Sequence, residues 1–268
     1  MNWEFAHTMA ITIAGNTYLQ GRDVGAFWPE APVFVFTRAV NFVSKAGSGA
    51  CGDVGVAADP LEWFSILSGN CHGLLLRCPW LDDPANAETQ DIYACRSGPS
   101  AFIEAIGANG SSIWLPEYSI DRQSDGRKSS SFTYRESGES ERRELLRDAA
   151  AITSDFDERL LAIADFADRE GLDVFSESFN QALQFLWAGS PPSNGWQVES
   201  MEGARLPLHA RQWLAACSSS WAYGGNGSWT DRGFPPREQE EFVEVTRRLY
   251  QIQVEAAVAA TNASYDGQ

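Results

Sequence analysis

The end of the chain carries the pattern that most restricts the fold. Between Pro236 and Asn262, apolar side chains recur at alternating steps of three and four residues, as Phe242, Val245, Leu249, Ile252, Ala256 and Ala259. This spacing places them along one face of a long helix. A free-standing coiled coil would need more heptads, so we expect other helices of the same chain to cover the stripe.

The segment from residue 142 onward is predicted to be a helical bundle domain. Helices are expected over 142–152, 156–169, 175–186 and 207–219, in addition to the final one. Asp155 followed by Glu158 resembles a capping box for the second of these helices, and Gly171 would end it.

Residues 1–120 are predicted to form a mixed α/β sheet domain, which makes the fold class α+β. Gly15-Asn16 predicts the turn of a β-hairpin, and Asp59-Pro60 predicts a helix start. Further strands are expected over 33–43, 72–78 and 112–118, and a brief helix over 99–106. The Ser-rich, charged stretch 121–141 is nearly free of aliphatic residues, so we interpret it as a linker or exposed loop.

The charge restricts the kind of partner. The formal net charge is −16, which disfavours nucleic acids and anionic membrane surfaces and permits a basic protein partner. No apolar run reaches the roughly 18–20 residues that span a bilayer. The N-terminus has Glu4 and no basic region, so we expect no signal peptide and a cytoplasmic location.

The sequence offers few groups for metal or cofactor chemistry. Cys71-His72 with Cys78 is the nearest approach to a metal site, but it lacks the paired C-x-x-C spacing that zinc sites use. We therefore expect no metal and no cofactor.

The candidate nucleophile and the paired carboxylates are both explained without a catalytic role. Cys51 lies in the stretch GSGACGD, which matches neither a G-x-S-x-G elbow nor a P-loop, so a flexible glycine loop is expected. The acidic groups around Asp155 and Glu238 lie where the first turn of a helix favours negative charge.

One stretch has a more distinctive composition, and two interpretations of it stay open. Between residues 210 and 236, large aromatic residues surround several glycines, which permit positive φ angles and close backbone approach. The stretch forms either an internal corner between helices or a binding site. The candidate binding residues are Trp221, Tyr223, Gly224, Gly225, Gly227, Ser228, Trp229 and Asp231.

This stretch also resembles a family of uncharacterised bacterial proteins. They share a W-x-F-G-G-x-G-S-W-N-D-like loop followed by a long helix that ends in an Ala/Asn-rich turn. The sequence here has Tyr223 where the family has Phe and Thr230 where it has Asn, and the long helix carries Ala256, Ala260 and Asn262. In size, acidity and Trp content, such proteins are similar to immunity proteins of bacterial toxin systems.

These observations favour an acidic, cytoplasmic, non-catalytic protein-binding module, of the immunity type that neutralises a basic partner. One alternative is a hydrolase with its active site between the two halves, in which Asp231 or Cys51 supplies a polar group. Another is a structural or scaffolding subunit that uses the final helix.

Overall fold

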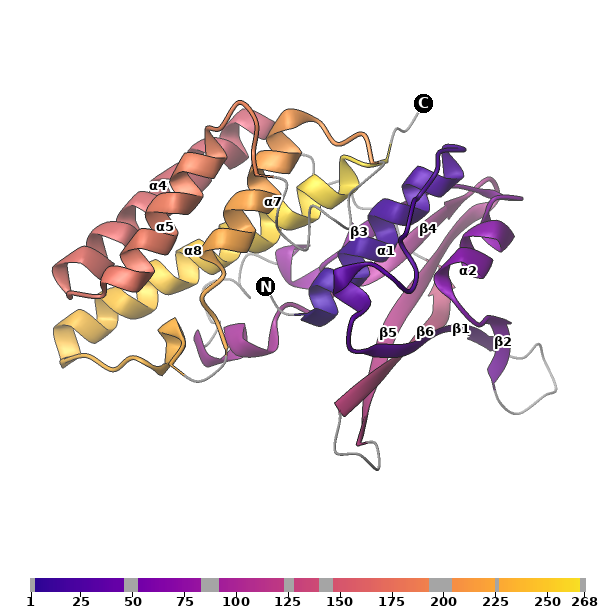
Figure 1. Ribbon diagram of the computed structural model, residues 1–268, viewed down its shortest axis with the longest axis horizontal. Helices are drawn as coiled ribbons and strands as arrows, with labels where there is room; N and C mark the ends of the chain where they lie inside the picture. The colour runs from indigo at the N-terminus through magenta and orange to yellow at the C-terminus, as the bar shows by residue number, and fades with distance from the viewer. Residues whose placement is uncertain are drawn as a thin grey trace.

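The computed structural model describes residues 3–45, 53–82, 92–122, 128–139, 147–192, 204–224 and 227–265. Its architecture is mixed α/β. A six-stranded sheet lies on one side of the N-terminal helix α1, and the C-terminal helices lie on the other (Figure 1).

The strands of the sheet follow the order β2-β1-β6-β5-β4-β3. Their bounds are Thr37–Lys45 (β1), Asp53–Ala57 (β2), Cys71–Arg77 (β3), Phe102–Gly107 (β4), Gly110–Arg122 (β5) and Lys128–Glu139 (β6). The β1–β6 pair is parallel, and the other neighbouring pairs are antiparallel. β2 and β3 are therefore the two edge strands.

The structure has α1 and further α-helices on both of its sides. Their bounds are Trp3–Leu19 (α1), Pro60–Leu67 (α2), Ala149–Arg169 (α4), Asp173–Leu186 (α5), Leu208–Ser220 (α7) and Pro236–Asn262 (α8). α2 contacts α1 and the strands β1 and β2, whereas α4, α5, α7 and α8 pack on one another. The prediction of α8 is confirmed at both ends. The prediction of α2 is confirmed as well, because the Asp59 side chain accepts a hydrogen bond from the Glu62 amide at 2.8 Å.

Helix α1 belongs to two hydrophobic cores. Phe5, Met9 and Ile13 pack among the C-terminal helices, whereas Ala10 and Ala14 pack against the sheet and α2. All residues from Phe5 to Thr17 are buried, because α1 packs against both the sheet and the C-terminal helices.

The β-hairpin predicted around Gly15-Asn16 is wrong, because both residues lie inside α1. Gly15 is needed there for close packing. A Cβ atom at this position would lie 2.3 Å from Leu74 Cδ1 and 2.9 Å from Phe64 Cε1. The glycine that suggested a turn instead lets α1 approach β3 and α2.

The linker predicted over 121–141 is also wrong in its described part, because β6 occupies residues 128–139 in the middle of the sheet. Phe132 and Tyr134 alternate with polar neighbours and are fully buried. The serine-rich start is compatible with a strand, because the Ser130 hydroxyl donates a hydrogen bond to the Phe36 carbonyl at 2.9 Å.

Two other predictions fail locally. The brief helix predicted over 99–106 is strand β4. The capping box at Asp155 is absent, because Asp155 lies within α4, a single helix whose N-cap is Asp148. Helical propensity is a weak signal in both places, and the tertiary neighbours decide the outcome.

Candidate functional site

Trp229 anchors the Trp/Gly corner to the helices. Its side chain is fully buried, and the indole N–H donates a hydrogen bond to Thr246 Oγ1 on α8 at 2.7 Å. Four phenylalanines surround the indole at ring-centroid distances of 5.2–6.0 Å: Phe166, Phe175, Phe179 and Phe242. These contacts fix the corner to α4, α5 and α8.

Asp231 closes the short helical turn Trp229–Asp231 (η4). Its side chain accepts a hydrogen bond from the Ser228 amide at 3.1 Å, which forms a capping box. It also forms an ion pair with Arg96. Desolvation raises the pKa of Asp231, but the Ser228 hydrogen bonds and the Arg96 charge outweigh it and hold this pKa below its usual value.

Arg96 ties the corner to the segment that precedes β4. Its guanidinium donates to the Thr230 hydroxyl and to the Thr230 carbonyl, each at 3.0 Å. Because Arg96 is 135 residues away from Asp231 in the chain, no local pattern could have identified it as the partner.

The other described residues of the corner pack inside the protein or shape its backbone. The Tyr223 ring is buried and meets the rings of Trp221 and Tyr250 at 5.4 and 5.2 Å. Gly224 and Gly227 have φ angles of 82° and 76°, which favour glycine. Gly225 lies outside the described residues. This geometry is that of an internal corner, and a binding role for these residues stays a prediction.

Two of the groups considered for catalysis or metal binding, Cys71 and Asp231, already have hydrogen-bond partners. Cys51 lies outside the described residues, and the carboxylate of Asp231 is already engaged. Burial raises the pKa of the Cys71 thiol, which opposes formation of a thiolate. Within the described ranges, no group of three or more His, Cys, Asp or Glu residues is placed to hold a metal ion.

His7 forms a buried polar cluster between α1 and the sheet. Its Nδ1 lies 3.3 Å from the Tyr134 hydroxyl, which lies 3.1 Å from Thr8 Oγ1. The imidazole stacks on Phe132 at 3.8 Å. Burial lowers the pKa of His7 to about 3, so the ring is neutral at physiological pH.

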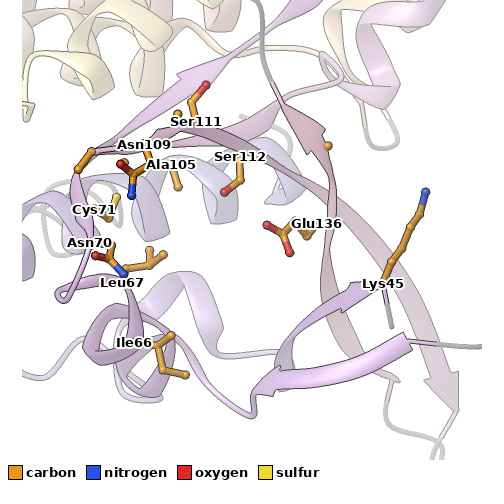
Figure 2. A pocket seen from close by; sticks show the side chains of 14 residues that line it. Lys45, Ile66, Leu67, Asn70, Cys71, Ala105, Asn109, Ser111, Ser112 and Glu136 are labelled. Atoms are coloured by element: carbon orange, nitrogen blue, oxygen red, sulfur yellow. The ribbon is translucent and has the colours of Figure 1, made fainter. Parts of the chain in front are cut away.

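A hollow of about 580 Å³ lies at one end of the sheet. It is bordered by the C-terminal end of α2, by the β4–β5 turn and by the end of β6 (Figure 2). Its polar side chains are contributed by Lys45, Asn70, Cys71, Asn109, Ser111, Ser112 and Glu136. Of these residues, the sequence pattern singles out only Cys71, because they come from four separate segments of the chain.

Several large apolar side chains are exposed at the opposite end of the sheet. Val35, Phe36, Tyr118 and Ile120 are 70%, 69%, 49% and 56% exposed; we call these four residues the apolar patch. Ser130 of β6 pairs with Ile120, and its amide donates to the Phe36 carbonyl at 3.0 Å. The two sides of the patch therefore flank one residue of β6.

Comparison with models of known families, with characterised proteins and with solved structures finds no match to this chain. Over the residues that the structure describes, no helix combines the length and the apolar character needed to cross a membrane.

Proposed function

We propose that the protein is a non-catalytic binding module whose partner is a basic protein. The apolar patch is the observation that carries this proposal. Contiguous exposed apolar surface is uncommon on monomeric proteins and is typical of interaction sites. Phe36 and Tyr118 are aromatic, and aromatic side chains often dominate the binding energy of an interface.

Packing contacts with α1 and β6 hold the side chains of the patch in place. Tyr118 packs edge-on against Trp3 of α1 at 6.5 Å and contacts Phe132 of β6 at 6.3 Å. Ile120 lies two residues farther along the same strand, and therefore on the same face of the sheet. Side chains that are already ordered lose little conformational entropy when a partner binds.

The charge of the chain indicates the chemistry of the partner. A formal net charge of −16 attracts a basic protein over long range and accelerates its association. The apolar patch would then provide the short-range contact. Binding should accordingly be fast at low ionic strength and should weaken as salt is added.

The narrower proposal is an immunity-type protein that neutralises its partner in the cytoplasm. Its support is the resemblance of the Trp/Gly loop and the acidity of the chain. We also propose that residues 142–268 serve as a helical bundle domain that supports the sheet. In this arrangement the Trp/Gly corner stabilises the helices, and the sheet carries the contact surface.

The test compares proteins captured from the source cells by immobilised wild type and by the double variant Phe36→Ser/Ile120→Ser. The matched control is Leu161→Ser/Val174→Ser, which removes apolar side chains that are 48% and 74% exposed on the helices. We expect a protein of basic isoelectric point that wild type and control retain at low salt and that the patch variant loses at least tenfold. Its activity should be inhibited by wild type and not by the patch variant.

Two results would overturn the proposal. One is retention of the same proteins by the patch variant and the wild type. The other is a wild-type dimer in sedimentation that dissociates on Phe36→Ser/Ile120→Ser, because the patch would then be covered by a second copy of the chain.

A further inference from the structure

The hollow at the end of the sheet is formed by neighbouring strands beyond the last turn of α2. Ala105 of β4 pairs with Ser112 of β5, and Glu136 of β6 pairs with Trp114 of β5. These residues therefore follow one another across three adjacent strands. Because α2 ends at Leu67, this part of the sheet stays open, and the hollow of about 580 Å³ has a size typical of small-molecule sites.

Polar side chains of the hollow have unused hydrogen-bonding capacity. Within the described part of the chain, the side chains of Asn70, Asn109 and Glu136 form no hydrogen bond or ion pair. Ser112 Oγ accepts a hydrogen bond from the Trp114 indole at 3.0 Å, so its own proton can be donated to a ligand. These groups lie around the hollow in Figure 2.

The charges around the hollow favour a cation. Glu136 is the acidic residue among the described lining residues, and the Lys45 side chain extends away from the other labelled side chains (Figure 2). The C-terminal end of α2, which borders the hollow through Ile66 and Leu67, adds the partial negative charge of its last carbonyl groups. The strongly acidic chain makes the surrounding potential still more negative.

An apolar wall faces these polar groups. Ile66 is 50% exposed at the rim, and Leu67 and Ala105 line the same hollow. A ligand that uses both parts needs a cationic end and an aliphatic body. Among the described lining residues an anion would meet no inward-pointing cation, and a metal ion would need more than one carboxylate.

We propose that this hollow binds a small organic cation, an aliphatic diamine, with one ammonium group at the Glu136 carboxylate and the other at the carboxamide oxygens of Asn70 and Asn109 across the hollow. The carbon chain of the amine packs against Ile66 and Leu67. This site is separate from the apolar patch and does not depend on the proposed protein partner.

The test is a titration of the ¹⁵N-labelled protein with 1,5-diaminopentane, followed by amide chemical shifts. We expect saturable shifts at Asn70, Asn109 and Ser112. Glu136→Gln should weaken the affinity at least tenfold, and Asn109→Ala should weaken it severalfold. The uncharged isostere 1,5-pentanediol should bind at least tenfold more weakly than the diamine.

A matched variant separates a defined site from general attraction to an acidic protein. Glu177→Gln makes the same change of charge at an exposed position on α5, and we expect its affinity for the diamine to stay within twofold of wild type. Equal binding of the diol, equal weakening by Glu136→Gln and Glu177→Gln, or shifts spread over the whole acidic surface would each refute the proposal.

A further experiment tests whether the ligand of the hollow is a free amine or a lysine side chain of the protein partner. If the site serves free amines, Glu136→Gln leaves capture of the basic partner unchanged. Loss of capture by Glu136→Gln would assign the hollow to the protein interface and overturn the small-molecule proposal. Failure to find any partner would leave the diamine titration as an independent result.

Discussion

Asn262, at the end of α8, holds both polar groups of the Leu76 peptide on the outer edge of β3. Its Oδ1 accepts a hydrogen bond from the Leu76 amide at 2.7 Å, and its Nδ2 donates to the Leu76 carbonyl at 3.0 Å. Asn16 of α1 makes the same pair of bonds to Leu74, at 2.6 and 2.8 Å. The two carboxamides thus occupy positions where another strand would pair.

This arrangement explains how the sheet, α1 and the end of the chain are joined. An unprotected edge strand is a template for pairing with other chains. Here the two asparagines satisfy the edge and also attach α1 and α8 to it. Gly73 permits this close approach, because a Cβ atom there would lie 2.1 Å from Tyr265 Cδ2.

Replacing either asparagine by alanine should destabilise the protein. Asn262→Ala or Asn16→Ala leaves an amide and a carbonyl of β3 without their partners, which costs about 1–3 kcal/mol in the free energy of unfolding. Urea denaturation measures this change. Asn109→Ala is the control and should stay within about 0.5 kcal/mol of wild type; equal effects at Asn109 and Asn262 would contradict the role of the edge contacts.

Gly15→Ala should also destabilise the protein, although alanine favours helices by about 1 kcal/mol. The added methyl group would meet Leu74 Cδ1 at 2.3 Å and Phe64 Cε1 at 2.9 Å, both on buried side chains. Overpacking of this kind costs about 1–3 kcal/mol. Gly189→Ala, with nothing within 4 Å of the new methyl group, should be neutral or slightly stabilising; thermal unfolding of both variants measures the difference.

Two tyrosines should respond differently to removal of their hydroxyl groups. The buried Tyr223 hydroxyl has no hydrogen-bond partner among the described residues, so Tyr223→Phe should leave stability unchanged or raise it by about 1 kcal/mol. The Tyr134 hydroxyl contacts both His7 and Thr8, so Tyr134→Phe should lower stability by about 1–3 kcal/mol. Denaturant unfolding of both variants decides the point; a larger loss for Tyr223→Phe would be inconsistent with this structure.

His7 should make the folded protein sensitive to acid. Its pKa is about 3 in the folded state and about 6.5 in the unfolded chain. The unfolded state therefore binds a proton more readily, and the contribution to stability falls as pH drops below 6.5, until it levels off below 3. Linkage gives a loss of about 2–3 kcal/mol between pH 7 and pH 4.5.

The measurement is urea denaturation of wild type and His7→Gln over this pH range. Glutamine does not titrate, so the variant should show a shallower decline, and the difference between the two curves isolates the histidine. Parallel curves would show that His7 does not remain neutral in the folded protein.

The sequence predicts an element correctly where the residues that define it are close together in the chain. The apolar stripe of α8 determined its face and both of its ends, and Asp59-Pro60 determined the start of α2. The continuous apolar run of β3 was also readable. In each case, the hydrogen bonds or the spacing that define the element lie within a few residues.

The sequence misled where a residue serves a distant neighbour. Gly15-Asn16 is a turn signal by composition, but its glycine accommodates Leu74 and its asparagine binds the edge of β3. Conversely, Asn109-Gly110 is a hairpin signal that marks a real turn: Ala108 and Asn109 connect β4 to β5, and Gly110 begins β5. The Ser-rich start of β6 resembles a linker because the stretch 121–141 is charged and nearly free of aliphatic residues.

The sequence by itself therefore determined the helical character of the C-terminal half, the acidity of the surface and the Trp/Gly corner as a distinctive segment. Only the tertiary structure decided that Asp231 is paired with Arg96, that α1 lies between two cores, and that an open hollow and an apolar patch lie at opposite ends of the sheet. The physical reason is the range of the interactions. Spacing along the chain encodes contacts within one turn or strand, whereas a site depends on contacts between residues separated by tens of positions or more.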